Sequence, residues 1–225
     1  HDNSFSSFLA AKNGRLYAIG DKGMTEITVD ENGTPFFRPY FARPGFTQFA
    51  KFYGGIEAPD GTVWIAGEEG LRYLHNDSLV KFSFPGKKII ARDIKIAADK
   101  SVWIATLGEG IFCCRFVAGG MLQLVKQYDE SDGLNTVQFL DLLIDREDNI
   151  WAGSVKGISL IRRSGKQNSR PVNFSEADGF IKPGYYTMQL HQDNKGAIWA
   201  GTSLGIASFM PNELSLRSPP PGIYI

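Results

Sequence analysis

The stretch Asp60-Gly-Thr-Val-Trp64-Ile-Ala-Gly67 decides the fold, because the chain repeats it at regular distance. All four tryptophans occupy the same place in this phrase, and a weaker early copy has tyrosine there. The other copies are Asp99-Lys-Ser-Val-Trp103-Ile-Ala-Thr106, Asp148-Asn-Ile-Trp151-Ala-Gly-Ser154, Lys195-Gly-Ala-Ile-Trp199-Ala-Gly-Thr202 and Asn13-Gly14-Arg15-Leu16-Tyr17-Ala18-Ile19-Gly20. Successive aromatic residues are 47, 39, 48 and 48 positions apart, and a period of this size indicates a repeat architecture.

Each repeat has room for four short strands. In the copy around Trp151, apolar runs at 137–144, 150–154 and 158–161 predict three strands, and 171–174 predicts a weaker fourth. Turn residues separate the runs, and sustained helical periodicity is missing from the sequence. Four antiparallel strands at this period are typical of a β-propeller blade. The sequence therefore predicts an all-β fold, a β-propeller of about five four-stranded blades.

The blades are expected at five successive ranges that together make one domain over residues 1–217. A closed five-blade ring and part of a seven-bladed propeller both remain possible, and an open arc would expose two blade faces. The proline-rich residues 218–225 are expected to begin a linker to a following domain. The predicted blades lie near 5–41, 46–84, 89–128, 137–175 and 185–217.

The repeated aromatic residues are interpreted as structural anchors between blades. A single four-stranded sheet leaves both faces open, so neighbouring blades must stack to bury them. The large area of a tryptophan suits this packing role better than a ligand-binding one. The expected anchors are Tyr17, Trp64, Trp103, Trp151 and Trp199.

Composition excludes several classes of function. The 24 basic and 24 acidic residues cancel, which argues against a nucleic-acid partner. No run of eighteen apolar residues is present, so no membrane segment is expected in this chain. Cys113 and Cys114 are adjacent and would point to opposite sides of a strand, so a bond between them is not expected.

Binding is a better hypothesis than catalysis. His75 and the acidic pairs fall in predicted turns, and His191 ends a predicted strand. Neither catalytic nor metal-ligand spacing is found among them. We therefore predict no catalytic residue, no metal and no cofactor. The loops that enter each innermost strand should converge on one mouth of the central channel and carry aromatic, amide and cationic side chains. The candidate ligand-binding residues are Arg92, Asn135, Gln138, Tyr185 and Tyr186.

The repeat phrase resembles the two-component-regulator propeller repeat. Asp132-Gly133-Leu134-Asn135, ahead of the third tryptophan phrase, and Asp178-Gly179-Phe180 ahead of the fourth strengthen this resemblance, which covers essentially the whole chain. The family comprises periplasmic sensor propellers of bacterial hybrid histidine kinases. The resemblance implies an inner-membrane receptor, a homodimer formed through the full-length receptor, and glycan-derived oligosaccharides as ligands. It also implies an immunoglobulin-like domain after residue 217 and kinase domains that this chain lacks.

The sequence therefore leaves three hypotheses for the function. The first is a non-enzymatic, ligand-sensing propeller that signals across the membrane. The second is a protein-interaction scaffold that uses blade edges or a flat face. The third is a propeller lyase or hydrolase, for which His191, Tyr185 and Arg92 form the best available set.

Overall fold

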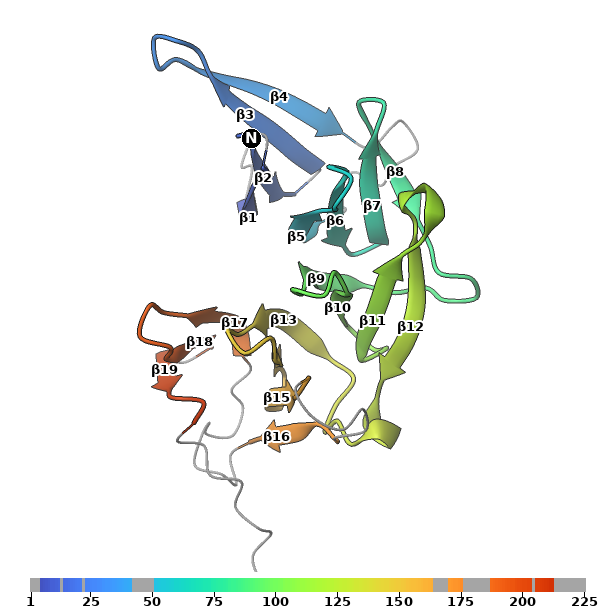
Figure 1. Cartoon of the computed structure of the whole chain (residues 1–225), viewed down its shortest axis with the longest axis vertical. Coiled ribbons are helices and arrows are strands. Elements are labelled where there is room, and N and C mark those ends of the chain that lie inside the picture. The colour runs from blue at the N-terminus through green and yellow to red at the C-terminus, as the bar shows by residue number, and fades with distance from the viewer. Residues whose placement is uncertain are drawn as a thin grey trace, which may run out of the picture.

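The computed structural model confirms the all-β fold and shows a β-propeller of five blades (Figure 1). It describes residues 5–12, 14–21, 23–41, 51–163, 170–175, 187–203 and 205–212. Each blade is an antiparallel meander in which consecutive strands are hydrogen-bonded neighbours. The end of the predicted fifth blade, at 213–217, and the expected linker at 218–225 lie outside the described residues.

The strands follow the repeat closely, with two short 3-10 helices in the connections of the third blade. The first two blades consist of β1 (Phe5–Ala10), β2 (Leu16–Gly20), β3 (Gly23–Val29), β4 (Pro35–Phe41), β5 (Phe52–Glu57), β6 (Val63–Gly67), β7 (Gly70–His75) and β8 (Ser78–Phe82). The third contains β9 (Ala91–Ile96), β10 (Val102–Thr106), β11 (Ile111–Phe116), η1 (Ala118–Gly120) and β12 (Leu122–Tyr128), followed by η2 (Glu130–Asp132). The last two contain β13 (Phe139–Ile144), β14 (Ile150–Ser154), β15 (Gly157–Ile161), β16 (Val172–Phe174), β17 (Thr187–Gln192), β18 (Ile198–Thr202) and β19 (Gly205–Phe209).

The second strand of each blade explains why the phrase around each tryptophan is apolar throughout. Side chains alternate between the two faces of a strand, so a strand between two blades is buried on both. In β10, Val102 and Ile104 pack toward the second blade, whereas Trp103 and Ala105 pack toward the fourth. The aromatic anchors of the first four blades all pack in this way toward the blade that follows.

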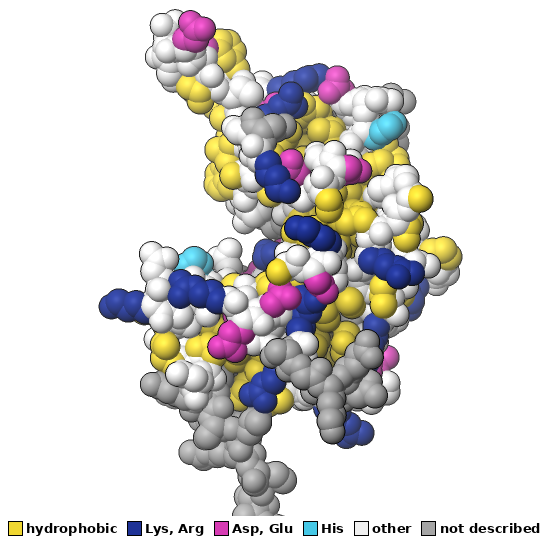
Figure 2. Space-filling model, viewed as in Figure 1, with side chains coloured by type: hydrophobic (Ala, Val, Ile, Leu, Met, Phe, Trp, Pro, Cys, Tyr) yellow, Lys and Arg dark blue, Asp and Glu magenta, His cyan; other side chains and the backbone are white. Residues whose placement is uncertain are grey.

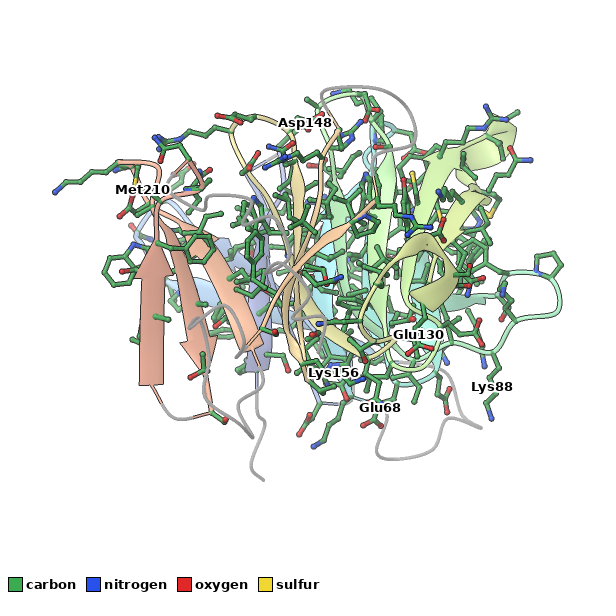
Figure 3. All side chains as sticks on the ribbon, turned by 90° about the horizontal axis from the view of Figure 1, so that it is seen from below. Glu68, Lys88, Glu130, Asp148, Lys156 and Met210 are labelled. Atoms are coloured by element: carbon green, nitrogen blue, oxygen red, sulfur yellow. The ribbon has the colours of Figure 1, made fainter. Side chains whose placement is uncertain are left out.

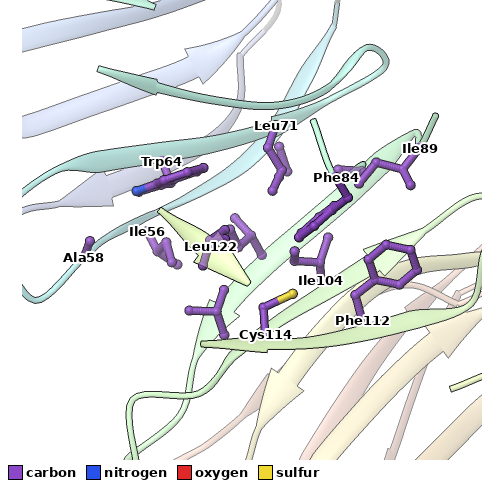
Figure 4. Packing of buried hydrophobic residues seen from close by; sticks show 14 residues of the cluster. Ile56, Ala58, Trp64, Leu71, Phe84, Ile89, Ile104, Phe112, Cys114 and Leu122 are labelled. Carbon is purple, nitrogen blue, oxygen red and sulfur yellow. The ribbon is translucent and has the colours of Figure 1, made fainter. Parts of the chain in front are cut away.

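The interface between the second and third blades shows this packing in detail (Figure 4). Trp64 is fully buried and lies 5.0 Å from Tyr73 and 5.2 Å from Phe82, measured between ring centroids. The ring centroid of Phe116, in the next blade, lies 6.1 Å from that of Trp64. Burying a side chain of this size contributes several kcal/mol at about 25 cal/mol per Å² of apolar surface.

In the fourth and fifth blades, an aspartate six residues before the tryptophan orders the turn before the second strand. Asp145 accepts hydrogen bonds from the backbone N–H groups of Glu147 and Asn149, and from Trp151 Nε1 at 2.7 Å. Asp193 binds Trp199 Nε1 in the same way at 2.9 Å. The aspartate thus ties the turn to the anchor within one blade.

The five blades follow one another along an arc, with the first and fifth at its two ends (Figure 1). The innermost strands β1, β5, β9, β13 and β17 contact each other in that order, and among the described strands β17 has no comparable contact with β1. Trp199, in the fifth blade, is 42% exposed, although Tyr17, Trp64, Trp103 and Trp151 are all buried. Burial of the anchor therefore depends on the presence of a following blade.

The two cysteines are free and lie side by side on β11. Cys114 is buried in the interface with the second blade, and Cys113 packs toward the fourth. Burial raises the pKa of Cys113 to about 11 and that of Cys114 further still, so both thiols stay protonated at neutral pH. Within the described ranges, no helix is long and apolar enough to cross a membrane.

Candidate functional site

The propeller has two edges, which Figure 3 shows at the top and bottom of the view. Asp148 lies on one edge, in the turn between the first and second strands of its blade. There Arg146 donates to the backbone carbonyls of Asp193 and Asn194 in the next blade, and Asp148 accepts from the backbone N–H of Ala98 in the preceding one. These contacts cross-link neighbouring blades, so this edge acts as a scaffold.

The opposite edge contains the residues where the chain enters each innermost strand, and it includes Glu68 and Lys156 (Figure 3). Here backbone hydrogen bonds fix the entry points: Glu68 N–H donates to Lys51, Leu107 N–H to Ile90, and Val155 N–H to Gln138. Main-chain groups thus hold the start of these innermost strands in place. We call this edge the entry edge.

Each innermost strand has a register shift near the entry edge. The pairing skips one residue between Phe52 and Gly54 in β5, and the extra residue is Tyr53. The same shift in β9 leaves Arg92 as the extra residue. Shifts of this kind re-aim a side chain out of the regular alternation and are common beside functional sites. The residues in the shifted position are Ser6, Tyr53, Arg92, Leu140 and Met188.

Two of these shifted residues meet between the second and third blades. The Arg92 guanidinium lies 3.7 Å from the centroid of the Tyr53 ring, a close cation–π contact. The Tyr53 hydroxyl donates to Glu68 Oε1 at 3.0 Å. Burial raises the pKa of Tyr53, while the Arg92 charge opposes that rise, so the phenol remains a protonated donor at neutral pH.

Arg92 also retains unused hydrogen-bonding capacity. Its Nε is buried and has no hydrogen-bond partner among the described residues. A buried donor left unpaired costs about 1–3 kcal/mol, so such atoms are uncommon and call for an explanation. A bound acceptor would remove that cost.

Asn135 lies on the same edge in the loop that leads to the fourth blade. Lys156 Nζ donates to its backbone carbonyl, and Asn173 Oδ1 accepts from its backbone N–H. The side-chain Oδ1 of Asn135 is buried without a hydrogen-bond partner in the described part of the chain. The loop therefore holds the Asn135 backbone firmly and leaves its amide oxygen open to a donor.

The structure separates the sequence-predicted residues into three groups. Arg92 and Asn135 lie on neighbouring blades at the entry edge, each with one unpaired buried atom, although no hydrogen bond between them is among the described contacts. Gln138 is exposed and bridges to Leu107 through its backbone. Tyr185 and Tyr186 fall outside the described residues.

Sequence reasoning missed Tyr53 and Glu68. Tyr53 occupies the same position in the second blade as Arg92 in the third, so superimposing the repeats would have found it. The contact itself depends on the register shift in each strand, which the sequence pattern does not reveal.

Aspartates on the innermost strands β9 and β13 bind the blade that follows each of them. Asp93 Oδ2 accepts a hydrogen bond from the backbone N–H of Leu142, and Asp141 Oδ2 accepts one from that of Leu190. Each carboxylate is therefore hydrogen-bonded to the next blade. Lys95 Nζ lies 2.8 Å from Asp93. Burial and the neighbouring Asp93 raise the pKa of Asp141 to about 8, and Lys95 opposes this rise. These groups join blades along the axis.

Of the residues suggested for catalysis, His191 and Arg92 lie at different depths along their strands, and Tyr185 lies outside the described residues. His191 pairs with Trp199, and the equivalent position in the third blade is Lys95, three residues beyond Arg92 along the strand. At about 3.3 Å per residue, His191 lies roughly 10 Å deeper than the level of Arg92. The described residues also include no group of three or more His, Cys, Asp or Glu side chains that could hold a metal ion.

No protein-family model matches the sequence, and no curated protein matches it either. Solved structures do share the fold. The extracellular domain of hybrid two-component system BT4673 from B. thetaiotaomicron superposes with a TM-score of 0.73 at 18% identity, covering 94% of this chain and 30% of that one. The corresponding domain of BT3049 from the same organism gives 0.67 at 17% identity, covering 94% and 29%.

An enzyme with the same fold is also similar. Virginiamycin B lyase from Staphylococcus aureus superposes with a TM-score of 0.62 at 15% identity, covering 90% of this chain and 68% of that one. The present chain spans less than a third of the length of either sensor domain. At these identities the similarities establish the propeller fold.

Proposed function

We propose that this chain is an extracytoplasmic, ligand-sensing propeller of a hybrid two-component sensor histidine kinase. It binds glycan-derived oligosaccharides at the entry edge and is located in the periplasm. Ligand binding shifts the placement of domains or protomers in the receptor and so changes kinase output across the membrane. The fold shared with two sensor ectodomains and the repeat phrase support this proposal.

One observation carries the choice of site. Arg92 is held on Tyr53 by stacking, and its buried Nε points to no acceptor within the described residues. A sugar hydroxyl or carboxylate accepts from such a donor, and the charged hydrogen bond is worth about 1.5–3 kcal/mol. Asn135 Oδ1, in the loop that leads to the next blade, is a second buried polar atom without a partner among the described residues.

Titration calorimetry after an oligosaccharide array screen tests the proposal. For an oligosaccharide that binds the 225-residue chain, Arg92→Ala should weaken affinity about 10- to 100-fold. Arg115→Ala is the matched control, because Arg115 is exposed on the third blade and donates a hydrogen bond to Gln123. Equal losses in both variants, or no binding to any oligosaccharide, would contradict the proposed site.

The lyase-like alternative has one supporting observation, the shared fold with an enzyme. It requires an acid and a base at the same level of the channel, whereas His191 and Arg92 lie at different depths along their strands. A measured turnover that His191→Ala abolishes would favour it over sensing.

A further inference from the structure

Among the described residues, positive charges that are at least partly buried are matched by carboxylates, with one exception. Arg92, which is half-buried on β9, has no carboxylate within ion-pair distance in the part of the chain that the structure describes. The other partly buried cations all have one: Arg72 pairs with Glu69, Lys87 with Glu109, Lys95 with Asp93, and Arg163 with both Asp99 and Asp148.

Charges on the surface are also balanced. On the face of the molecule that Figure 2 views, Lys and Arg side chains are interspersed with Asp and Glu side chains. The whole chain has 24 basic and 24 acidic residues. A partly buried charge without a counterion is unfavourable, because burial removes hydration and nothing replaces it. The unmatched charge of Arg92 therefore calls for a partner of opposite sign.

The acidic side chain of the site, Glu68, does not neutralise Arg92. Glu68 Oε1 accepts the hydrogen bond of the Tyr53 hydroxyl at 3.0 Å. The Arg92 guanidinium lies instead over the face of the same ring, 3.7 Å from its centroid. Glu68 is exposed, so water hydrates its charge. Tyr53 thus contacts the cation through its ring and the carboxylate through its hydroxyl, and Arg92 is left without a counterion among the described residues.

We propose that the ligand of the entry edge is anionic and presents a carboxylate or a sulfate group to Arg92. This inference rests on the proposed function and narrows its ligands to acidic oligosaccharides, those that contain uronic acids or sulfated sugars. A guanidinium has planar, paired donors that match either group, and the unpaired Nε is one of them. Stacking on Tyr53 restricts the guanidinium beforehand, so less conformational entropy is lost on binding.

Matched pairs of oligosaccharides test the charge of the ligand. Calorimetry compares each acidic oligosaccharide that binds the chain with its carboxyl-reduced form and, where it is sulfated, with its desulfated form. Loss of the recognised anion should weaken binding about tenfold or more in the wild type, but less than about twofold in Arg92→Ala. Raising the NaCl concentration from about 50 to 500 mM should weaken wild-type binding more than binding by Arg92→Ala.

A second variant tests the same contact in the opposite direction. Glu68→Gln removes a negative charge beside the site and keeps an acceptor for the Tyr53 hydroxyl. Affinity for an acidic oligosaccharide should rise about two- to fivefold, because a like charge is removed, and affinity for its neutral form should not change. Glu130→Gln is the matched control, since Glu130 is exposed in η2 and does not belong to the site.

Stability without ligand separates a binding role of Arg92 from a structural one. Arg92→Met keeps a long side chain and removes the unmatched charge. The Tm of the unliganded variant should therefore stay within about 2 °C of the wild type or rise above it. A Tm lower by more than about 5 °C would show that the fold itself requires this charge, and would overturn its assignment to a ligand.

The outcomes also separate this inference from the proposed function. If the neutral forms bind as tightly as the acidic ones and Arg92→Ala weakens both, the site is correct and the anionic ligand is wrong. The same holds if every oligosaccharide that binds is neutral. Acidic oligosaccharides whose binding Arg92→Ala leaves unchanged would contradict the site as well. If no oligosaccharide binds, the proposed function and this inference both fail.

Discussion

The fourth and fifth blades contain nearly the same phrase, Ile150-Trp151-Ala-Gly-Ser154 and Ile198-Trp199-Ala-Gly-Thr202, in different surroundings. Both form a central strand, and in both the tryptophan donates to the aspartate of the preceding turn. Trp151 is nonetheless buried against the fifth blade, whereas Trp199 faces solvent. The phrase itself thus determines the local strand and turn geometry. The stabilisation gained from burying the tryptophan comes from the next blade.

The largest expected difference between the two blades is the loss of stability when each tryptophan is replaced by alanine. Trp151→Ala should lower the free energy of unfolding by about 3–5 kcal/mol, because it empties a buried interface. Trp199→Ala should cost about 1 kcal/mol, since much of the ring is already hydrated. Urea unfolding at low protein concentration measures both, and equal losses would contradict the structural difference.

The glycine that opens the third strand gives a second matched pair. Gly157 has a φ of 120°, and a Cβ there would collide with the carbonyl oxygen of Phe174. Gly157→Ala should therefore cost about 3 kcal/mol from backbone strain and displacement of β16. Gly205 has a φ of 145° with nothing within 4 Å of an added Cβ, so Gly205→Ala should cost about 1 kcal/mol.

The axial aspartates should make stability depend on pH. The pKa of Asp141 rises from 3.8 to about 8 in the folded chain, so the unfolded carboxyl loses its proton first as pH increases. Titration of Asp141 therefore makes the free energy of unfolding fall as the pH rises from about 4 to 8. Above about pH 8 this contribution no longer changes.

Asp141→Asn removes this titration and keeps an acceptor for the Leu190 N–H. The difference in slope of unfolding free energy against pH should reach at most about 1.4 kcal/mol per pH unit, the value for one proton. Chemical unfolding from pH 4 to 9 measures both slopes. Equal slopes for the wild type and Asp141→Asn would contradict the raised pKa of Asp141.

The smallest expected effect is a change in the pKa of Asp193, in the turn before the second strand of the fifth blade. Hydrogen bonds, first of all from Trp199 Nε1, lower the pKa of Asp193 below 3.8. Any stability that this carboxylate supplies is present above pH 3.8 and is lost as pH falls through the lowered pKa. Trp199→Phe should move the midpoint back toward 3.8 in an NMR titration. Ile206→Ala, which leaves the indole in place, should not.

Much of this organisation could be predicted from the repeat. The period indicated propeller blades, and the alternation around Trp103 explains why strands buried on both sides read as unbroken apolar runs. Arg92 was identified from its place before an innermost strand, but its partner Tyr53 was not. Their contact arises from two register shifts in neighbouring blades, and such shifts leave no clear mark in a hydrophobic pattern.

The sequence by itself determined the strands, the turns and the anchor positions, because these depend on short-range alternation and on hydrogen bonds within a few residues, such as Asp145 with Trp151. Only the tertiary structure decided which anchors are buried and which polar atoms stay unpaired. Among the described residues, Trp199 is exposed and Arg92 Nε finds no acceptor, because both outcomes depend on what neighbouring blades, distant in the sequence, place beside them.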